Sequence, residues 1–224
     1  MAPDTAPPTT APPTVVFDLD GTLVDSLPDI IASFQHSFTV YNLPVPGEQA
    51  VRAEIGKPLE EMFATFAPAH VHELSREYRR HYPEHFTDRS APYPGVLELL
   101  STLRERGYLL AVATTKRSDM ALRFTRALGL TSYLDVIQGT DHFPHKPAPD
   151  VIYKALTAVA GDGVWMVGDT AHDIGAGKAA GLKTYAVTWG TQDAAQLAAA
   201  EPDELQPDLQ KLLEHLPPLP PKPS

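Results

Sequence analysis

The chain has 224 residues, a formal net charge of −10, a hydrophobic content of 43% and no cysteine. This length is enough for one large domain, or for one domain with a modest second one, and it can bury a sizeable core without disulfides. The acidic balance disfavours a nucleic-acid binder with a broad basic surface, the hydrophobic content argues against wholesale disorder, and the absence of cysteine excludes thiolate nucleophiles and cysteine-ligated zinc.

Proline is concentrated at the two ends of the chain. Ten of the 23 prolines lie within residues 1–14 and 217–224, so we expect a disordered proline-rich tail at each end. As an alternative, the second tail forms a polyproline II helix for a proline-reading partner. Residues 1–14 do not resemble a secretory signal, and no apolar run is long enough to span a membrane. With the missing cysteines, this predicts a cytoplasmic protein that binds no membrane.

From residue 15 onward, strand-like and helix-like segments alternate. Five short apolar runs are typical of buried parallel strands: Val15–Phe17, Tyr108–Thr114, Leu134–Gln138, Val164–Val167 and Thr184–Val187. Four segments have helical periodicity or helix-capping residues: Gly95–Arg106, Ser118–Leu128, Pro147–Ala160 and His172–Ala180. This alternation predicts an α/β fold with a Rossmann-like, doubly wound parallel sheet.

Residues 29–90 interrupt the alternation. They contain four helix-like pieces and no convincing strand, with apolar stripes such as Ile30, Ile31, Phe34 and Phe38. A helical insertion directly after the first strand stands over the carboxyl end of that strand, where open α/β sheets bind ligands. We therefore predict a core domain of residues 14–28 and 91–216 and an inserted α-helical cap domain of residues 29–90.

Four loops that follow or lie beside predicted strand ends carry reactive side chains. They span residues 18–22, 114–116, 145–149 and 168–173. Because parallel strands end at the same sheet edge, these loops can converge, and their carboxylates would repel one another unless a cation joined them. Hard oxygen ligands without sulfur favour Mg²⁺. A carboxylate can accept a phosphoryl group, and a lysine with hydroxyls can stabilise the transferred charge.

Residues 17–26, with the sequence FDLDGTLVDS, resemble the first motif of the haloacid dehalogenase superfamily. All four motifs of that family follow in order between residue 15 and about residue 190. The sequence is most similar to the phosphoglycolate-phosphatase-like subgroup, which carries a helical C1-type cap. The resemblance implies a Mg²⁺-dependent phosphatase that hydrolyses a small phosphate monoester through an aspartyl-phosphate intermediate.

The resemblance also implies roles for individual acidic residues. Asp18 matches the nucleophile that accepts the phosphoryl group and ligates Mg²⁺. Asp20 matches the general acid and base, and its backbone carbonyl matches a metal ligand. Asp169 matches the remaining metal carboxylate. Asp173 matches either a metal ligand or a residue that orients one.

The other matching residues are expected to hold phosphate or substrate. Thr114 matches the hydroxyl that binds a phosphate oxygen, and Lys146 matches the lysine that offsets negative charge on nucleophile and phosphate. Four further positions are expected to contact substrate: Gly21, Thr22, Thr115 and Lys57. Gly21 and Thr22 also shape the turn after the first strand. Residues 52–58 are the predicted specificity loop, from which Lys57 or Arg52 would meet a substrate carboxylate.

Several alternatives stay open from the sequence. Asp20 favours phosphoryl transfer over dehalogenation, whereas Thr115, at a position where similar phosphatases often carry asparagine, leaves the substrate open. A sugar-phosphate mutase or an inorganic pyrophosphatase of the same superfamily is the nearest alternative, and Thr22 in place of the valine of mutases favours hydrolysis. A non-enzymatic phosphoacceptor module is the alternative from another class. We expect a small phosphorylated metabolite as partner and a monomer or homodimer.

Two further patterns predict no additional ligand. Residues 175–180 fit the G-x-G-x-x-A dinucleotide pattern, but they lie inside a predicted helix and not in a turn after a strand. His142 and His145 lack a third zinc ligand at suitable spacing. Asp25 and Ser26 fit the family pattern and are interpreted as residues of the loop and of the following helix start, without a catalytic role.

Overall fold

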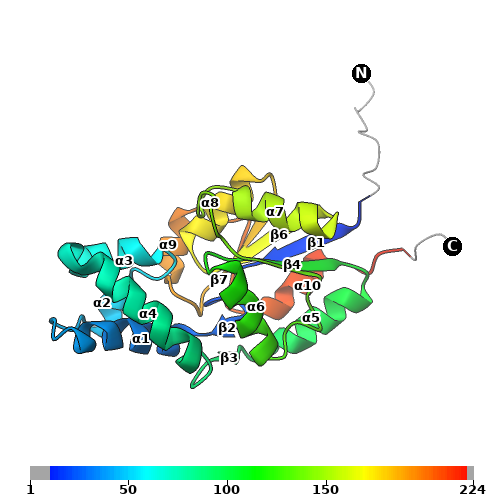
Figure 1. Cartoon of the computed structure of the whole chain (residues 1–224). Coiled ribbons are helices and arrows are strands. Elements are labelled where there is room, and N and C mark those ends of the chain that lie inside the picture. Colours follow the sequence, from blue (N-terminus) through cyan, green and yellow to red (C-terminus); the bar gives the residue numbers. More distant parts are fainter. Residues whose placement is uncertain (1–10, 221–224) are drawn as a thin grey trace.

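The computed structural model describes residues 11–220, so most of the first predicted tail and the end of the second lie outside the described residues (Figure 1). A parallel six-stranded sheet forms the centre, in the order β5-β4-β1-β6-β7-β8. Its strands are β1 (Pro13–Phe17), β4 (Leu109–Ala113), β5 (Val136–Gln138), β6 (Asp162–Gly168), β7 (Lys183–Val187) and β8 (Glu204–Gln206). The predicted Rossmann-like α/β sheet is confirmed. Of these six strands, β8, a three-residue strand at the sheet edge, was not predicted.

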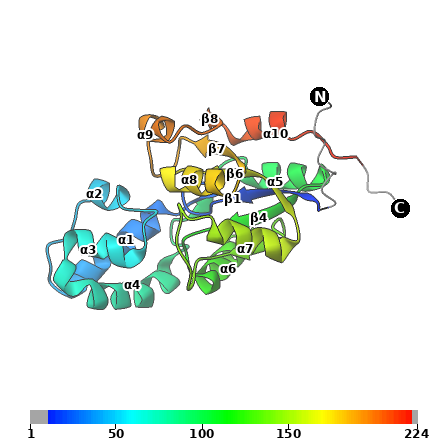
Figure 2. The same cartoon turned by 90° about the horizontal axis from the view of Figure 1, so that it is seen from above.

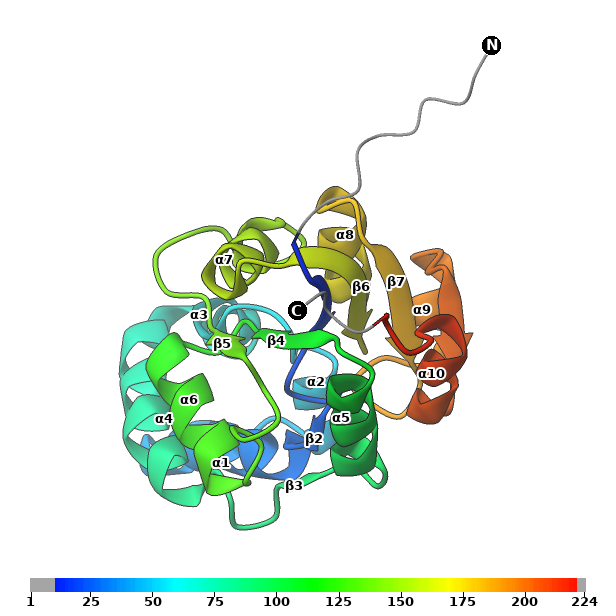
Figure 3. The same cartoon turned by 90° about the vertical axis from the view of Figure 1, so that its right-hand side faces the viewer.

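Alternating side chains of β1 supply two separate hydrophobic cores. Val15 and Phe17 face one side of the sheet, and Val16 faces the other. On the first side pack α5 (Val96–Glu105), α6 (Ser118–Ala127) and α10 (Leu212–His215). On the second side pack α7 (Asp150–Val159) and α8 (Ala171–Ala179), with α9 (Ala194–Ala199) beside α8. Figure 3 shows α7 and α8 on the opposite side of the sheet from α5 and α6.

The segment between β1 and α5 forms a helical layer with its own core. It contains α1 (Leu27–Val40), α2 (Glu48–Arg52), α3 (Leu59–Phe66), the 3-10 helix η1 (Pro68–His70) and α4 (Val71–His85). Phe34 of α1 stacks on Phe63 of α3 with ring centroids 4.2 Å apart, and Leu74 of α4 packs on the same cluster. These helices lie beyond the carboxyl ends of the sheet strands (Figures 1 and 2). We call residues 27–85 the cap.

Two adjacent chain crossings connect the cap to the core. The short strands β2 (Val24–Asp25) and β3 (Ala91–Pro92) pair antiparallel where the chain leaves and re-enters the core. The buried carboxylate of Asp29 accepts hydrogen bonds from the backbone amides of Arg89 and Ser90, at 2.9 and 2.8 Å. The two crossings are therefore fastened to each other, so the covalent connections between cap and core lie side by side.

The described residues of both predicted tails make contacts with the core. Pro13 already belongs to β1, and the carbonyl oxygen of Pro12 accepts a hydrogen bond from the amide of Asp162 at 2.9 Å. At the other end, the hydroxyl of Tyr108 donates to the carbonyl oxygen of Pro217 at 3.0 Å. The amide of Leu219 donates to the carbonyl oxygen of Arg106 at 2.8 Å. Pro12, Pro13, the carbonyl oxygen of Pro217 and Leu219 therefore contact the core, although they lie within the predicted tails.

One predicted helix boundary also changes. The helix expected from Pro147 begins at Asp150, because prolines disfavour helical backbone at the residues before them.

Within residues 11–220, no helix combines the length and apolar character required to cross a bilayer.

Candidate active site

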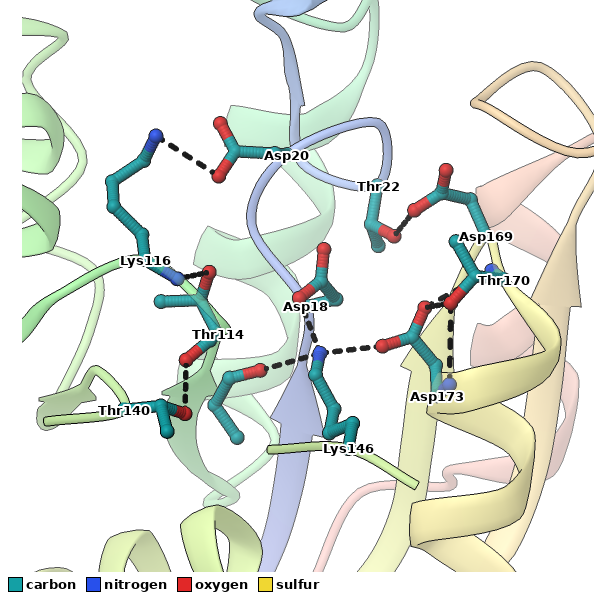
Figure 4. A network of polar contacts seen from close by, with 11 residues as sticks. Asp18, Asp20, Thr22, Thr114, Lys116, Thr140, Lys146, Asp169, Thr170 and Asp173 are labelled. Carbon is teal, nitrogen blue, oxygen red and sulfur yellow. Dashed lines mark hydrogen bonds and ion pairs between the residues drawn. The ribbon is translucent and has the colours of Figure 1, made fainter. Parts of the chain in front are cut away.

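The four predicted loops meet at the carboxyl edge of the sheet (Figure 4). Asp18 directly follows β1, Thr114 follows β4, and Asp169 follows β6, while Lys146 lies in the loop before α7. The backbone amide of Asp18 donates to the carbonyl oxygen of Val167 at 2.8 Å, which extends the sheet pairing past the end of β1. Side chains that are distant in sequence thus converge on a rigid support.

Lys146 is the central cation of the buried part of the site. Its Nζ lies 2.5 Å from Oδ1 of Asp18 and 2.5 Å from Oδ1 of Asp173, and it donates to the carbonyl oxygen of Ala113 at 3.0 Å. Burial lowers the pKa of Lys146, but the charges of Asp173 and Asp18 outweigh burial and raise that pKa overall. We call Asp18, Lys146, Asp169 and Asp173 the carboxylate–lysine cluster.

Hydrogen bonds from threonines orient the two carboxylates near β6. The hydroxyl of Thr22 donates to Oδ1 of Asp169 at 2.8 Å, and the amide of Thr191 donates to Oδ2 at 2.7 Å. Oδ2 of Asp173 accepts from the amide and the hydroxyl of Thr170, at 3.0 and 2.6 Å, in the capping box of α8. Asp173 therefore uses one oxygen to begin a helix and the other to hold Lys146.

The cluster has the donor set of a site for a hard cation. Asp18, Asp169 and Asp173 offer carboxylate oxygens that all lie within 4.8 Å of one another. Burial and, after it, the charge of Asp173 raise the pKa of Asp169 to about 6. Burial also raises the pKa of Asp18 well above its usual value, although Lys146 opposes the shift. A divalent cation bound by these oxygens would offset the repulsion that remains, so the residues fit such a cation.

No comparable group supports the rejected zinc hypothesis. Within residues 11–220, no further set of three histidine, cysteine or acidic side chains lies close enough to share an ion. His142 and His145 line the cavity described below without forming such a set. The carboxylate of Asp20 is also outside the cluster, and its predicted metal contact, through the backbone carbonyl, stays a prediction.

Gly21 and Thr22 support the site from inside the protein. The amide of Gly21 donates to the carbonyl oxygen of Val24 at 2.9 Å, and the hydroxyl of Thr22 donates to Oδ1 of Asp169. Gly21 has φ +86°, and a Cβ at this position would lie only 2.4 Å from Oδ2 of Asp169. Their polar groups are engaged within the core, and their predicted substrate contact stays a prediction.

The loop after β4 places two threonines near the cluster. Oγ1 of Thr114 accepts from the amide of Lys116 at 3.2 Å, and the carbonyl oxygen of Thr114 accepts from the hydroxyl of Thr140 at 3.0 Å. Thr115 lines the cavity. Thr114 keeps its hydroxyl proton available for an anionic oxygen, and its phosphate contact stays a prediction.

Asp20 belongs to a second polar group, which sequence reasoning missed. Oδ1 of Asp20 accepts from the hydroxyl of Ser26 at 2.6 Å, and Oδ2 lies 3.1 Å from Nζ of Lys116. Nζ of Lys116 also donates to the hydroxyl oxygen of Tyr82 in the cap at 2.9 Å. The position of Lys116 two residues after Thr114 could have signalled its role. No sequence pattern relates Tyr82 to the motif loops.

A cavity of about 950 Å³ lies between the cap and the carboxylate–lysine cluster. Asp18 and Lys146 line its core side, and Gly56 and Lys57 of the predicted specificity loop line its cap side. Nζ of Lys57 donates to Oε2 of Glu54 at 2.8 Å. The other predicted candidate, Arg52, instead donates to the carbonyl oxygen of Gly190 at 3.0 Å and thereby fastens the cap to the core.

The dinucleotide-like glycines have a packing role. Gly175 and Gly177 both lie within α8, and a Cβ on Gly177 would lie 2.7 Å from Cβ of Met166 in β6. The glycine therefore allows the helix to approach the sheet closely.

Comparison with known proteins agrees with this geometry. The family model described as haloacid dehalogenase-like hydrolase matches residues 15–187. The chain is 36% identical to pyrophosphatase PpaX of Halalkalibacterium halodurans, over 90% of this chain and 95% of that protein. It is also 36% identical to a phosphoglycolate phosphatase of Mesorhizobium japonicum, over 81% of this chain and 85% of that protein.

Solved structures are similar over almost the whole chain. A haloacid dehalogenase-like hydrolase from Streptococcus pneumoniae has a TM-score of 0.83 and 30% identity, covering 92% of this chain and 98% of that one. A predicted phosphoglycolate phosphatase from Haemophilus somnus has a TM-score of 0.82 and 28% identity, covering 90% and 96%. With its four motif loops converging under a helical cap, the chain belongs to the haloacid dehalogenase-like hydrolases.

Proposed function

We propose that the protein is a Mg²⁺-dependent phosphatase that hydrolyses a small, phosphoglycolate-like phosphate monoester. The observation that carries the proposal is the short contact between Lys146 and Asp18 inside a buried cluster of three carboxylates. A lysine held there offsets negative charge on the nucleophile and on the phosphoryl group that it accepts. The names of the similar proteins support the reaction class.

In the proposed reaction, a carboxylate oxygen of Asp18 attacks phosphorus. The bond from phosphorus to the leaving oxygen breaks, and the carboxyl group of Asp20 gives its proton to that oxygen. Asp20 then takes a proton from a water molecule that attacks the aspartyl-phosphate. Inorganic phosphate is released, and both aspartates return to their initial state.

The remaining residues of the site bind and orient. Asp18, Asp169 and Asp173 would hold Mg²⁺, whose charge, when it is bound, stabilises the phosphoryl oxygens. The hydroxyls of Thr114 and Thr115 are proposed to bind those oxygens as well. The cap covers the cavity and excludes bulk water from the phosphorylated Asp18.

Lys57 is the proposed contact for the rest of the substrate. It lines the cap side of the cavity, and within residues 11–220 its Nζ has one partner, a carboxylate oxygen of its own loop at 2.8 Å. A substrate carboxylate would compete with Glu54 for this ammonium group. A small ester with a second negative charge therefore suits the cavity best.

Inorganic pyrophosphate is the second candidate substrate. The relatives named pyrophosphatase PpaX favour it, and its second phosphoryl group would offer Lys57 the same kind of negative charge as a carboxylate. A mutase would return an isomerised sugar phosphate without free phosphate, and a phosphoacceptor module would form a stable aspartyl-phosphate without turnover.

The test is a release assay for inorganic phosphate over a panel of small phosphate esters and pyrophosphate, with and without Mg²⁺. We expect Mg²⁺-dependent release, fastest with a small carboxylate-bearing monoester. Faster release from pyrophosphate would establish the second candidate. The absence of release from every compound would contradict hydrolysis.

A further inference from the structure

Lys116 is a nearly buried cation that the carboxylate–lysine cluster does not use. Its side chain is 10% exposed, and its Nζ lies 3.1 Å from Oδ2 of Asp20 and 2.9 Å from the hydroxyl oxygen of Tyr82. The rings of Tyr82 and Phe124 flank the ammonium group, with centroids 4.7 and 5.0 Å from Nζ. Two aromatic faces, a carboxylate and a phenol therefore hold this lysine in one position.

Tyr82 supplies the part of this arrangement that belongs to the cap. It lies on α4, is 3% exposed, and stacks on Tyr78 with ring centroids 5.1 Å apart. Burial raises the pKa of Tyr82 well above its usual value, so the phenol stays neutral and its oxygen accepts from Lys116. The position of this oxygen follows the position of α4.

The two oxygens of Asp20 have different supports. Oδ1 is held by the hydroxyl of Ser26, which directly precedes the cap and is fully buried. Oδ2 is held by Lys116, whose own position depends on Tyr82. If α4 moved away from the core, Oδ1 would keep its partner, whereas the support of Oδ2 would lose its cap contact.

From this geometry we propose that Lys116 and Tyr82 are positioning residues, which hold the Asp20 carboxyl group in place for proton transfer while the cap covers the core. The inference rests on the proposed function, because it assigns the proton transfers to Asp20. Proton transfer is thereby linked to the covered state of the cavity, and the aspartyl-phosphate is hydrolysed under the cap.

The two half-reactions depend on Asp20 to different degrees, and this makes the inference testable. When p-nitrophenyl phosphate transfers its phosphoryl group to Asp18, the leaving phenolate is stable without a proton. An alkyl phosphate must receive a proton on its leaving oxygen. Hydrolysis of the aspartyl-phosphate requires removal of a proton from water with either substrate. A poorly held Asp20 therefore slows both steps for an alkyl ester but only the second step for the p-nitrophenyl ester.

The experiment follows the first turnover and the steady state of Lys116→Met and Tyr82→Phe by rapid mixing with Mg²⁺ present. With p-nitrophenyl phosphate we expect a burst of about one p-nitrophenolate per active site. A steady state slowed roughly 100-fold in Lys116→Met and roughly 10-fold in Tyr82→Phe should follow. The intact mass after acid quenching should show phosphorylated protein. With an alkyl phosphate we expect slow turnover without a burst, and a smaller fraction of phosphorylated protein than with p-nitrophenyl phosphate.

Matched controls remove similar groups elsewhere. Lys154→Met removes a lysine that lies 4.9 Å from the ring centroid of Phe143, and Tyr41→Phe removes a cap hydroxyl that accepts from Arg76. Both controls should keep the kinetics of the unchanged protein. Tyr82→Phe retains the ring and the volume of the side chain, so it decides the question if Lys116→Met does not fold.

The outcomes separate this inference from the proposed function. Equal slowing of both substrates without a burst would mean that the contacts only maintain the structure, and it would overturn the inference. Unchanged turnover in both variants would overturn it as well. If the unchanged protein released phosphate from neither ester, the proposed function would fail, and the inference would fail with it.

Discussion

The two polar groups of the site have different supports. The carboxylate–lysine cluster is built only from core residues at one edge of one sheet, and each of its side chains is buried. The Asp20–Lys116–Tyr82 chain crosses from the core to the cap. The difference indicates a division of labour in the proposed reaction. The charges proposed to stabilise a phosphoryl group are held within the core, whereas one oxygen of Asp20, the proposed proton-transferring group, is held with the help of the cap.

The largest expected effect tests the carboxylate–lysine cluster. Asp18→Asn removes the attacking oxygen while preserving side-chain size, so we expect turnover to fall roughly 10⁴-fold or more. The control Asp193→Asn changes an acidic residue at the N-cap of α9, where asparagine caps equally well, and should leave turnover unchanged. The measurement is Mg²⁺-dependent phosphate release by both variants. Full activity of Asp18→Asn would remove the nucleophile assignment.

A second prediction compares the two lysines directly. Lys146→Met leaves the buried carboxylates of Asp18 and Asp173 without their cation, so we expect the free energy of unfolding to fall by about 3–5 kcal/mol. Lys116→Met should cost less, because the side chain of its partner Asp20 is 14% exposed and can be hydrated. Urea denaturation of the metal-free proteins at neutral pH measures both values. Equal losses of unfolding free energy in the two variants would contradict the expected difference between the carboxylate–lysine cluster and the Asp20–Lys116–Tyr82 chain.

The same division explains what the sequence could predict. The strand-end loops lie at one edge in any parallel sheet, so the sequence could predict that Asp18, Lys146 and Asp169 lie at the same edge. The contact with Tyr82 depends on how the cap helices pack, through stacked rings such as Phe34 and Phe63. That packing leaves no local pattern in the sequence.

Backbone contacts were equally difficult to predict. The amide of Thr191 orients Asp169, and any residue type can supply such a donor. The same holds for the amide of Leu219, which pairs with the core inside a predicted tail. The hydrogen bond from the side chain of Thr22 to Asp169 joins residues 147 positions apart, and no local sequence pattern indicates it.

A third prediction concerns the pH dependence of stability and tests the carboxylate–lysine cluster. Burial raises the pKa of Asp169 to about 6 in the folded protein, above the ordinary value of 3.8. The folded state therefore binds this proton more tightly than the unfolded state. The contribution of Asp169 to stability falls as pH rises from about 4 to about 6, by about 3 kcal/mol in the metal-free protein.

The measurement is urea denaturation of the metal-free protein across this pH range, compared with Asp169→Asn. Because the variant has no carboxyl group at this position, the difference between the two curves isolates its titration from that of other acidic groups. Added Mg²⁺ should flatten the curve of the unchanged protein by binding the ionised carboxylates. Parallel curves for the two metal-free proteins would contradict the raised pKa of Asp169 in the folded protein.

The smallest expected effect tests the cap side of the cavity. Lys57→Ala removes a cation whose partner, Glu54, is 2.8 Å away on the same loop. If a substrate carboxylate displaces Glu54, we expect the variant to raise KM roughly 10-fold for a carboxylate-bearing phosphate ester, with kcat within about twofold. An uncharged alkyl phosphate of similar size should show an unchanged KM. The cap would then recognise the leaving group through Lys57. This contact would be independent of the hydrogen bond from Lys116 to Tyr82. An equal rise in KM for both esters would instead mean that Lys57 maintains the loop and does not read the charge of the substrate.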